Sequence, residues 1–333
     1  MARKLRVEFE GAVYHVMSRG DQRERIFVDN EDRKLFLATL GEACAKTEWQ
    51  LHAFCLMSNH FYLVVETLRA NLSAGMRWFL GTYTGRYNRR HRLFGHLFSG
   101  RFKALNVDAT SPGYLKTVCD YVHLNPVRAK LIAAGKPVRS YAWSSYPEYL
   151  RKPGKRLSWL RVERLLGEWG IGRDDATSKG RFEQGMEMRA EQERAKESGD
   201  WKKLRRGWCW GPNTFREELL DRIGESRTRA HEGPEIRQSE EQKAERLIGG
   251  MLRQAGWKEG ELEKRAKGDK TKARIAERLR GETTMTWEWI AKRLRTAERR
   301  STQREPFRNG KERKYSISHF RPLADPFLSP NLK

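Results

Sequence analysis

Two short runs of β-type pattern, joined by a two-residue turn, most constrain what this chain can fold into. The runs are residues 51–57 ("LHAFCLM") and 60–66 ("HFYLVVE"), with Ser58-Asn59 between them. This spacing predicts a β-hairpin, and period-two alternation places His60 and Tyr62 on one face of the second strand. Antiparallel pairing across the turn would put Cys55 opposite Tyr62.

The elements around the hairpin predict a ferredoxin-like domain. Residues 12–19 and 102–108 have strand patterns, and residues 30–49, 73–91 and 111–132 have helical patterns, the first after a cap at Asp29 or Asn30. The order is strand, helix, strand, strand, helix, strand, helix. We therefore expect an α+β fold with a split βαβ antiparallel sheet and helices on one face, which leaves the other face free for a ligand.

Composition divides the rest of the chain into three further regions. Residues 1–150 make up the expected α+β domain, 151–237 a polar linker or irregular helical region, 238–303 a helix-turn-helix-like DNA-binding region, and 304–333 a loosely ordered tail. Within residues 238–303 one helix should end at Gly281, followed by a threonine cap at Thr284 or Thr286. The next helix should turn its apolar side chains inward, namely Trp287, Ile290, Ala291 and Leu294.

The charge of the chain points to a polyanionic partner. The 67 Lys and Arg residues against 43 Asp and Glu give a net charge of +24, which favours nucleic acid over solubility alone. Residues 67–107 contain no Asp or Glu, and basic and aromatic side chains alternate there. Cations can follow phosphates and exposed rings can stack on unpaired bases. The candidate DNA contacts are Arg77, Arg86, Arg89, Arg90, Arg101, Lys103 and Arg128.

A second signal is "CDYVHLNPVRAKL", where Tyr121 and Asn125 lie four residues apart and share a helix face. Pro126 restrains Asn125 and should bend or end the helix there. A tyrosine can attack a phosphodiester and store the bond energy in a covalent phosphotyrosine link. Its phenol has a pKa near 10, so attack at neutral pH needs help such as a metal ion on the phosphate.

Four segments together resemble the REP-associated tyrosine transposases, which are single-tyrosine transposases of the HUH (His-hydrophobic-His) family with an IS200-like domain. They are "GAVYHVMSRGD", "NHFYLVV", "YNRRHRLFGHLFSGRFKAL" and "DYVHLNPVRAKL", all within residues 1–150. The resemblance implies a nuclease and strand transferase for single-stranded DNA, often with an imperfect REP-like hairpin as target. It implies a homodimer as well, sometimes with the tyrosine helix exchanged between the subunits. It also implies that Tyr121 is the nucleophile, and that His60 and Asn125 help to hold Mg²⁺ or Mn²⁺.

The chain departs from the family pattern at Tyr62, which stands where the second histidine is expected. A neutral phenol is a weak ligand, so metal affinity should be lower than in a two-histidine site. Cys55 and His15 are candidates to compensate, although both are more often structural. His123 should point away from Tyr121, and His52, His91 and His96 are interpreted as surface or DNA-facing residues.

Two main hypotheses and a weaker third follow. The chain is a metal-dependent tyrosine transposase, or a degenerate relative that binds hairpin DNA without cutting it; the third is a duplex-specific regulator acting through its C-terminal helices. The four scattered cysteines, without a Cys-x-x-Cys pair, fit a reducing compartment. No apolar run approaches membrane-spanning length, so we expect a cytoplasmic, nucleoid-associated protein with no membrane or small-molecule partner.

Overall fold

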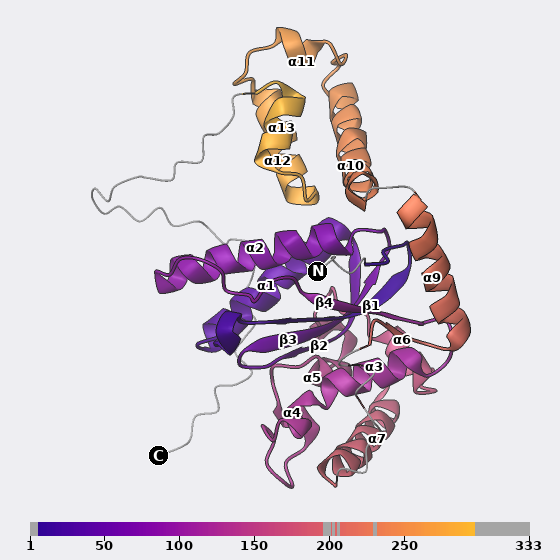
Figure 1. Ribbon diagram of the computed structural model, residues 1–333. Coiled ribbons are helices and arrows are strands. Elements are labelled where there is room, and N and C mark those ends of the chain that lie inside the picture. The colour runs from indigo at the N-terminus through magenta and orange to yellow at the C-terminus, as the bar shows by residue number, and fades with distance from the viewer. Residues whose placement is uncertain (1–5, 196–200, 202–203, 205–206, 229–231, 297–333) are drawn as a thin grey trace. The chain divides into compact units, whose positions relative to one another are not determined.

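The computed structural model describes residues 6–195, 201, 204, 207–228 and 232–296. Its centre is a five-stranded mixed sheet in the order β2-β3-β1-β4-β5 (Figure 1). The strands are β1 (Ala12–Arg19), β2 (Trp49–Leu56), β3 (His60–Thr67), β4 (Lys103–Val107) and β5 (Cys209–Trp210). The first four strands pair antiparallel, as the ferredoxin-like prediction requires, and β5 adds a parallel edge that the sequence did not indicate.

Helices connect and follow the strands. Those of the first 228 residues are α1 (Asn30–Thr47), α2 (Leu72–His91), α3 (Tyr114–His123), α4 (Asn125–Arg128), α5 (Tyr146–Leu150), α6 (Glu163–Glu168), α7 (Ala176–Arg194) and α9 (Asn213–Thr228). Short 3-10 turns lie at η1 (Asp21–Arg23), η2 (Val138–Ser140) and η3 (Pro153–Lys155). The later helices are α10 (Glu232–Gln254), α11 (Glu261–Lys264), α12 (Lys270–Glu282) and α13 (Trp287–Leu294).

The predicted hairpin is confirmed. The amide of Met57 donates to the carbonyl of His60 at 2.8 Å and closes the tight turn. Cys55 lies opposite Tyr62, as the turn length predicts. The register shifts between Leu51 and Ala53, so an extra residue, His52, is accommodated in a bulge.

Helices cover both faces of the sheet, so the prediction of one free face is wrong. On one face Phe61 packs against Phe36 of α1 and Phe79 of α2, with ring centroids 4.9 and 6.2 Å away. On the other face Tyr62 contacts Tyr121 of α3. Figure 1 shows α1 and α2 on one side of the sheet and α3 on the other. Every residue of β3 after His60 is buried as a result.

Local hydrogen bonds explain where α1 begins and ends. The side chain of Asp29 accepts from the amide of Asp32 at 3.0 Å, so Asp29 is the N-cap, the first of the two candidates that the sequence offered. The helix ends at Thr47, because Glu48 takes up the left-handed conformation with φ 61°. Trp49, which the helical pattern included, is the first residue of β2.

The third helix is shorter than the sequence predicted at both ends. The side chain of Asp108 accepts from the amides of Thr110 and Ser111, and this local bonding competes with helix formation. Gly113, with φ +86°, then precedes the first residue of α3. At the other end Leu124 leaves helical geometry and Pro126 follows, so α4 is a separate turn.

The hydrophobic core of the sheet extends well beyond residue 150. Leu165 of α6 and Phe182, Met186 and Ala190 of α7 are buried in the same cluster as the strands. These residues fall in the region interpreted from sequence as a polar linker. Charged residues separate the apolar positions of α7, so the composition of this segment alone did not indicate a helix with a buried face.

Helices α10, α12 and α13 form a second cluster of buried side chains, with Ile248, Ile275 and Ile290 among them. The threonine cap is confirmed at Thr286, whose hydroxyl accepts from the amide of Trp289 at 3.2 Å. Ile290, Ala291 and Leu294 are buried as expected. Trp287 is 43% exposed, so its predicted inward position is wrong.

The predicted tail, residues 304–333, lies outside the described residues. Within the described part of the chain, no helix has the length and apolar character needed to cross a lipid bilayer.

Candidate active site

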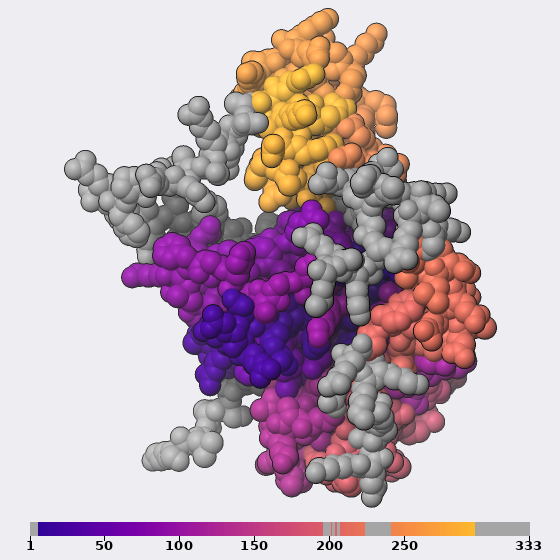
Figure 2. All heavy atoms as spheres, in the orientation of Figure 1, coloured from indigo at the N-terminus to yellow at the C-terminus, as the bar shows by residue number. Residues whose placement is uncertain are grey.

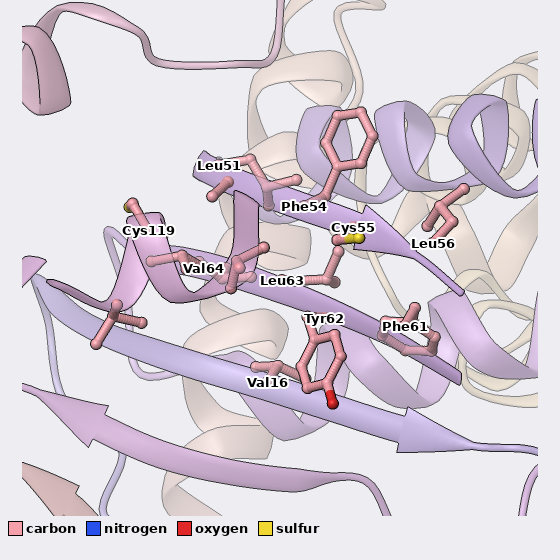
Figure 3. Packing of buried hydrophobic residues seen from close by; sticks show 14 of the residues in the cluster. Val16, Leu51, Phe54, Cys55, Leu56, Phe61, Tyr62, Leu63, Val64 and Cys119 are labelled. Atoms are coloured by element: carbon pink, nitrogen blue, oxygen red, sulfur yellow. The ribbon is translucent and has the colours of Figure 1, made fainter. Parts of the chain in front are cut away.

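Three elements bring aromatic side chains together at the candidate active site. His15 of β1 stacks on Tyr62 of β3 with ring centroids 5.6 Å apart, and Tyr121 of α3 meets both rings edge-on at 5.5 and 6.0 Å. Figure 3 shows the Tyr62 ring reaching toward β1. The packing of α3 on this face therefore carries Tyr121 to the strand that begins with His60.

His60 lies at the edge of this cluster. Its ring meets Tyr62 at 5.1 Å, and its Nδ1 is 2.7 Å from the side-chain oxygen of Asn59. Burial, with the positive charge of Arg19 nearby, lowers the pKa of His60 to about 4, so the imidazole is neutral at pH 7. In the part of the chain that the structure describes, no ring contact joins His60 to Tyr121. Tyr62 contacts both.

Two side chains cover Tyr121 and leave it only 2% exposed. The Arg128 guanidinium lies 4.2 Å from the centre of the Tyr121 ring, donates to the Tyr121 carbonyl and pairs with Glu193 at 2.8 Å. Burial lowers the pKa of Arg128 from its ordinary value. The Trp201 ring lies 5.3 Å from the Tyr121 ring. In this conformation the phenol is closed off from solvent.

Sequence reasoning missed Trp201, which covers the Tyr121 ring, and Glu193, which pairs with the covering Arg128. Both come from segments more than 60 residues after Tyr121, and neither stands in a motif. A side chain brought in from a distant segment leaves no local periodic signal. Nothing in the sequence alone could have identified these contacts.

Asn125, the predicted helical ligand, follows the break between α3 and α4. It is 7% exposed, and its Nδ2 has no hydrogen-bond partner among the described residues. Tyr121 and Asn125 are therefore not successive residues of one continuous helix face. The one-turn relation that the sequence suggested is interrupted at Leu124.

The residues at this site do not fit a two-histidine metal centre. Burial raises the pKa of Tyr62, and contact with Tyr121 raises it further, so the phenol stays protonated at neutral pH. Burial also raises the pKa of the Cys55 thiol, and Cys55 lies 3.6 Å from the sulfur of Met57. Within the described ranges, no group of three or more His, Cys, Asp or Glu side chains could hold a metal ion.

His15, the other compensating candidate, is buried beside Tyr62 and Tyr121. Burial lowers its pKa to about 4, and the positive charge of Arg128 acts in the same direction. Its Nε2 has no hydrogen-bond partner among the described residues. His15 is therefore a neutral imidazole at pH 7, packed as part of the aromatic cluster.

The candidate DNA contacts divide into paired and unpaired cations. Arg86 pairs with Glu42 at 2.7 Å, Arg90 pairs with Asp29 and Asp32, and Arg128 pairs with Glu193. The side chains that are exposed and form no ion pair with a described residue are Arg77, Arg89, Arg101 and Lys103. These four are the better candidates for phosphate contacts, because a paired cation must first lose its carboxylate.

The remaining histidines sort by their surroundings. His52 is fully buried, with its Nε2 2.8 Å from Glu66, so its interpretation as a surface or DNA-facing residue is wrong. His91 is half-buried, and its Nε2 lies 2.8 Å from Asp32. His96 is exposed. The Nε2 of His123 lies 2.8 Å from the hydroxyl oxygen of Ser145. His123 therefore points away from Tyr121, as the sequence predicted.

Residues 8–125 match the family model described as transposase, IS200-like. Residues 8–125 are therefore similar to an IS200-like transposase domain. The match runs from the segment before β1 to the first residue of α4, so it includes His60, Tyr121 and Asn125. It confirms the resemblance to IS200-like transposases that the four sequence segments indicated.

Among solved structures, the chain is similar to a REP-associated tyrosine transposase bound to a REP hairpin. The two chains are 12% identical with a TM-score of 0.37, and the likeness covers 44% of this chain and 84% of that chain. No curated protein shows a significant match to this chain.

Proposed function

We propose that the chain binds single-stranded or hairpin DNA through its IS200-like transposase domain, and that Tyr121 attacks a phosphodiester of that DNA. One observation carries the proposal: α3 brings Tyr121 into contact with Tyr62, two residues along β3 from His60. These residues are far apart in sequence, and they meet inside the domain that matches the transposase family.

In the proposed step the Tyr121 oxygen forms a bond to phosphorus, and its proton passes through water to the leaving 3′ oxygen. The bond from phosphorus to the 3′ oxygen breaks, and that oxygen takes up a proton to leave as a 3′ hydroxyl. The DNA is then held as a phosphotyrosine ester, which a second 3′ hydroxyl can attack to rejoin a strand. Arg128, beside the Tyr121 ring, would balance the negative charge of the phosphate once its ion pair with Glu193 opens.

Access to Tyr121 is required for this step. The phenol is buried under Arg128 and Trp201, so DNA binding must displace at least Trp201 before a phosphate can reach it. The unpaired cations Arg77, Arg89, Arg101 and Lys103 can hold the backbone of an incoming strand. We propose REP-like palindromes as the natural target, with the unpaired part of the hairpin reaching Tyr121.

A second candidate function is hairpin binding without cleavage. It is favoured by Tyr62, a protonated phenol at the position where the family pattern has a metal-binding histidine. It is favoured too by the closed state of Tyr121, which is 2% exposed.

A single experiment separates the two candidates. The full chain is incubated with a labelled DNA hairpin that carries a single-stranded extension, in buffer with Mn²⁺ or Mg²⁺, and run on a denaturing gel. A labelled protein band with wild type, absent with Tyr121→Phe, supports strand transfer. Hairpin binding by both proteins without such a band supports binding alone, and no binding by either contradicts both candidates.

A further inference from the structure

The structure separates one aromatic side chain from all others in the acid-free stretch of residues 67–107. Phe79, Tyr83, Tyr87, Phe98 and Phe102 are buried, and Trp78 packs against the core. Phe94 is 97% exposed, more than any other large apolar side chain among the described residues. A ring this exposed gains little from hydrophobic burial, so packing within the fold does not account for Phe94.

The loop that presents Phe94 has a fixed shape on both sides of the ring. At the end of α2, Arg92 takes up the left-handed conformation with φ 56°, and the amide of Leu93 donates to the carbonyl of Asn88 at 2.9 Å. The side chain of Asn88 donates to the carbonyl of Gly95 at 3.0 Å, and Gly95 has φ +89°. Phe94 is therefore held outward between two residues tied to the same asparagine.

The far side of this loop is anchored beside the candidate active site. The amide of Asp21 donates to the carbonyl of Leu97 at 3.0 Å. The amide of Ser99 donates to the carbonyl of Arg19 at 2.9 Å. Arg19 is the cross-strand partner of His60. In Figure 2 the purple end of α2 and the indigo residues that follow β1 adjoin on the surface. DNA that approaches His60 would pass this loop.

Charge around Phe94 matches a nucleic acid. Arg89, Arg92 and Arg101 are exposed, and none forms an ion pair with a described residue. No Asp or Glu occurs in residues 67–107 to neutralise them. An exposed ring surrounded by unpaired cations suits a partner that has both bases, on which the ring can stack, and phosphates, which the cations can bind.

We propose that Phe94 stacks on an unpaired base of the bound DNA while Arg89, Arg92 and Arg101 contact the flanking phosphates. This inference deepens the proposed function, since it rests on single-stranded DNA being the ligand. The ring is a recognition contact outside the Tyr121 cluster, so it would select unpaired over paired DNA without taking part in strand transfer. Stacking on one base corresponds to roughly 1–3 kcal/mol, or about 5- to 150-fold in affinity.

The test measures binding of the full chain to a single-stranded oligonucleotide that carries the fluorescent base 2-aminopurine, whose emission falls when it stacks. Phe94→Ala should weaken binding about 5- to 150-fold and remove the quenching, and Phe94→Trp should preserve both. Because no phosphate contact is lost, the salt dependence of binding should keep its slope, whereas Arg92→Ala should flatten it. Met188→Ala, which removes another exposed apolar side chain (61% exposed), is the matched control.

The outcomes are distinct. Phe94→Ala with unchanged affinity and quenching overturns the stacking role and leaves the proposed function intact. Equal weakening of blunt duplex binding also overturns it, because paired bases offer no free face. Failure of the wild-type chain to bind single-stranded DNA contradicts the proposed function itself, and binding of RNA in place of DNA does the same. Unchanged thermal unfolding of Phe94→Ala confirms that the variant is folded.

Discussion

The phenol of Tyr62 occupies the position where a second imidazole would pair with His60. It contacts His60 on one side and Tyr121 on the other, so it lies between the two groups that the family chemistry brings together. The raised pKa of Tyr62 keeps its phenol protonated, and a protonated phenol is a weak ligand for a metal ion. Under the proposed function, the affinity of the site for a metal ion depends on this one side chain.

Replacing Tyr62 with histidine should restore metal affinity. Tyr62→His places an imidazole two residues from His60 on the same face of β3, and the two rings can then share an ion. We expect Mn²⁺ binding at least about tenfold tighter than in wild type, measured by isothermal titration calorimetry.

Tyr62→Phe is the matched control, because it removes the hydroxyl without adding a nitrogen. It should bind Mn²⁺ no better than wild type. Equal and weak binding by all three proteins would show that the missing histidine is not what limits the site.

At the scale of elements, one polar cluster joins the hairpin to α6. Glu66 of β3 accepts hydrogen bonds from His52 of β2 at 2.8 Å and from Arg164 of α6 at 2.6 Å. Burial alone would raise the pKa of Glu66, but the hydrogen bond from His52 and the charge of Arg164 outweigh it and hold the pKa at about 2. The carboxylate thus ties together segments about 100 residues apart.

This cluster predicts a pH dependence of stability. Because the pKa of Glu66 is depressed, its contribution is present above the ordinary value of 4.5 and is lost as the pH falls toward about 2. The loss should amount to about 1–3 kcal/mol after allowance for solvent screening. Glu66→Gln should be less stable than wild type at pH 7, and the gap should narrow toward pH 2 in thermal unfolding. A gap independent of pH would contradict the assignment.

Individual elements were predictable where the pattern is local. The strands of residues 12–19 and 60–66 and the cap at Asp29 follow from alternation and from a side chain bonding its own backbone, and the structure confirms them. The start of α3 was not predictable, because the Asp108 turn competes with an equally plausible helix. The covering of Tyr121 by Trp201 depends on long-range packing that no local pattern encodes.

At the scale of the whole molecule, the buried clusters suggest which parts of the chain can be separated. The core of the sheet includes Phe182 and Met186 of α7, so a chain cut after Arg151 would lose part of its core. Helices α10, α12 and α13 have a buried cluster of their own. We propose that α12 and α13 serve as a helix-turn-helix contact for double-stranded DNA beside the hairpin.

Truncation after Thr228 should therefore separate two kinds of DNA binding. The truncated chain keeps the sheet, α7 and the loop of Phe94, so its affinity for single-stranded DNA should stay within about threefold of wild type. Its affinity for duplex DNA next to the hairpin should fall by about tenfold or more. Fluorescence anisotropy with the two probes measures both. Loss of single-strand binding on truncation would place the main contact surface in the C-terminal helices.

The most direct measurement is to identify the residue that becomes attached to DNA. A hairpin with a bridging 3′-phosphorothiolate at each single-stranded position is incubated with the full chain, because the released thiol reverses the attack poorly. After proteolysis, mass spectrometry should find the nucleotide on the peptide that contains Tyr121, and Tyr121→Phe should yield none. Attachment to a different tyrosine, or a bound hairpin recovered with no attachment under any divalent ion, would contradict Tyr121 as the nucleophile.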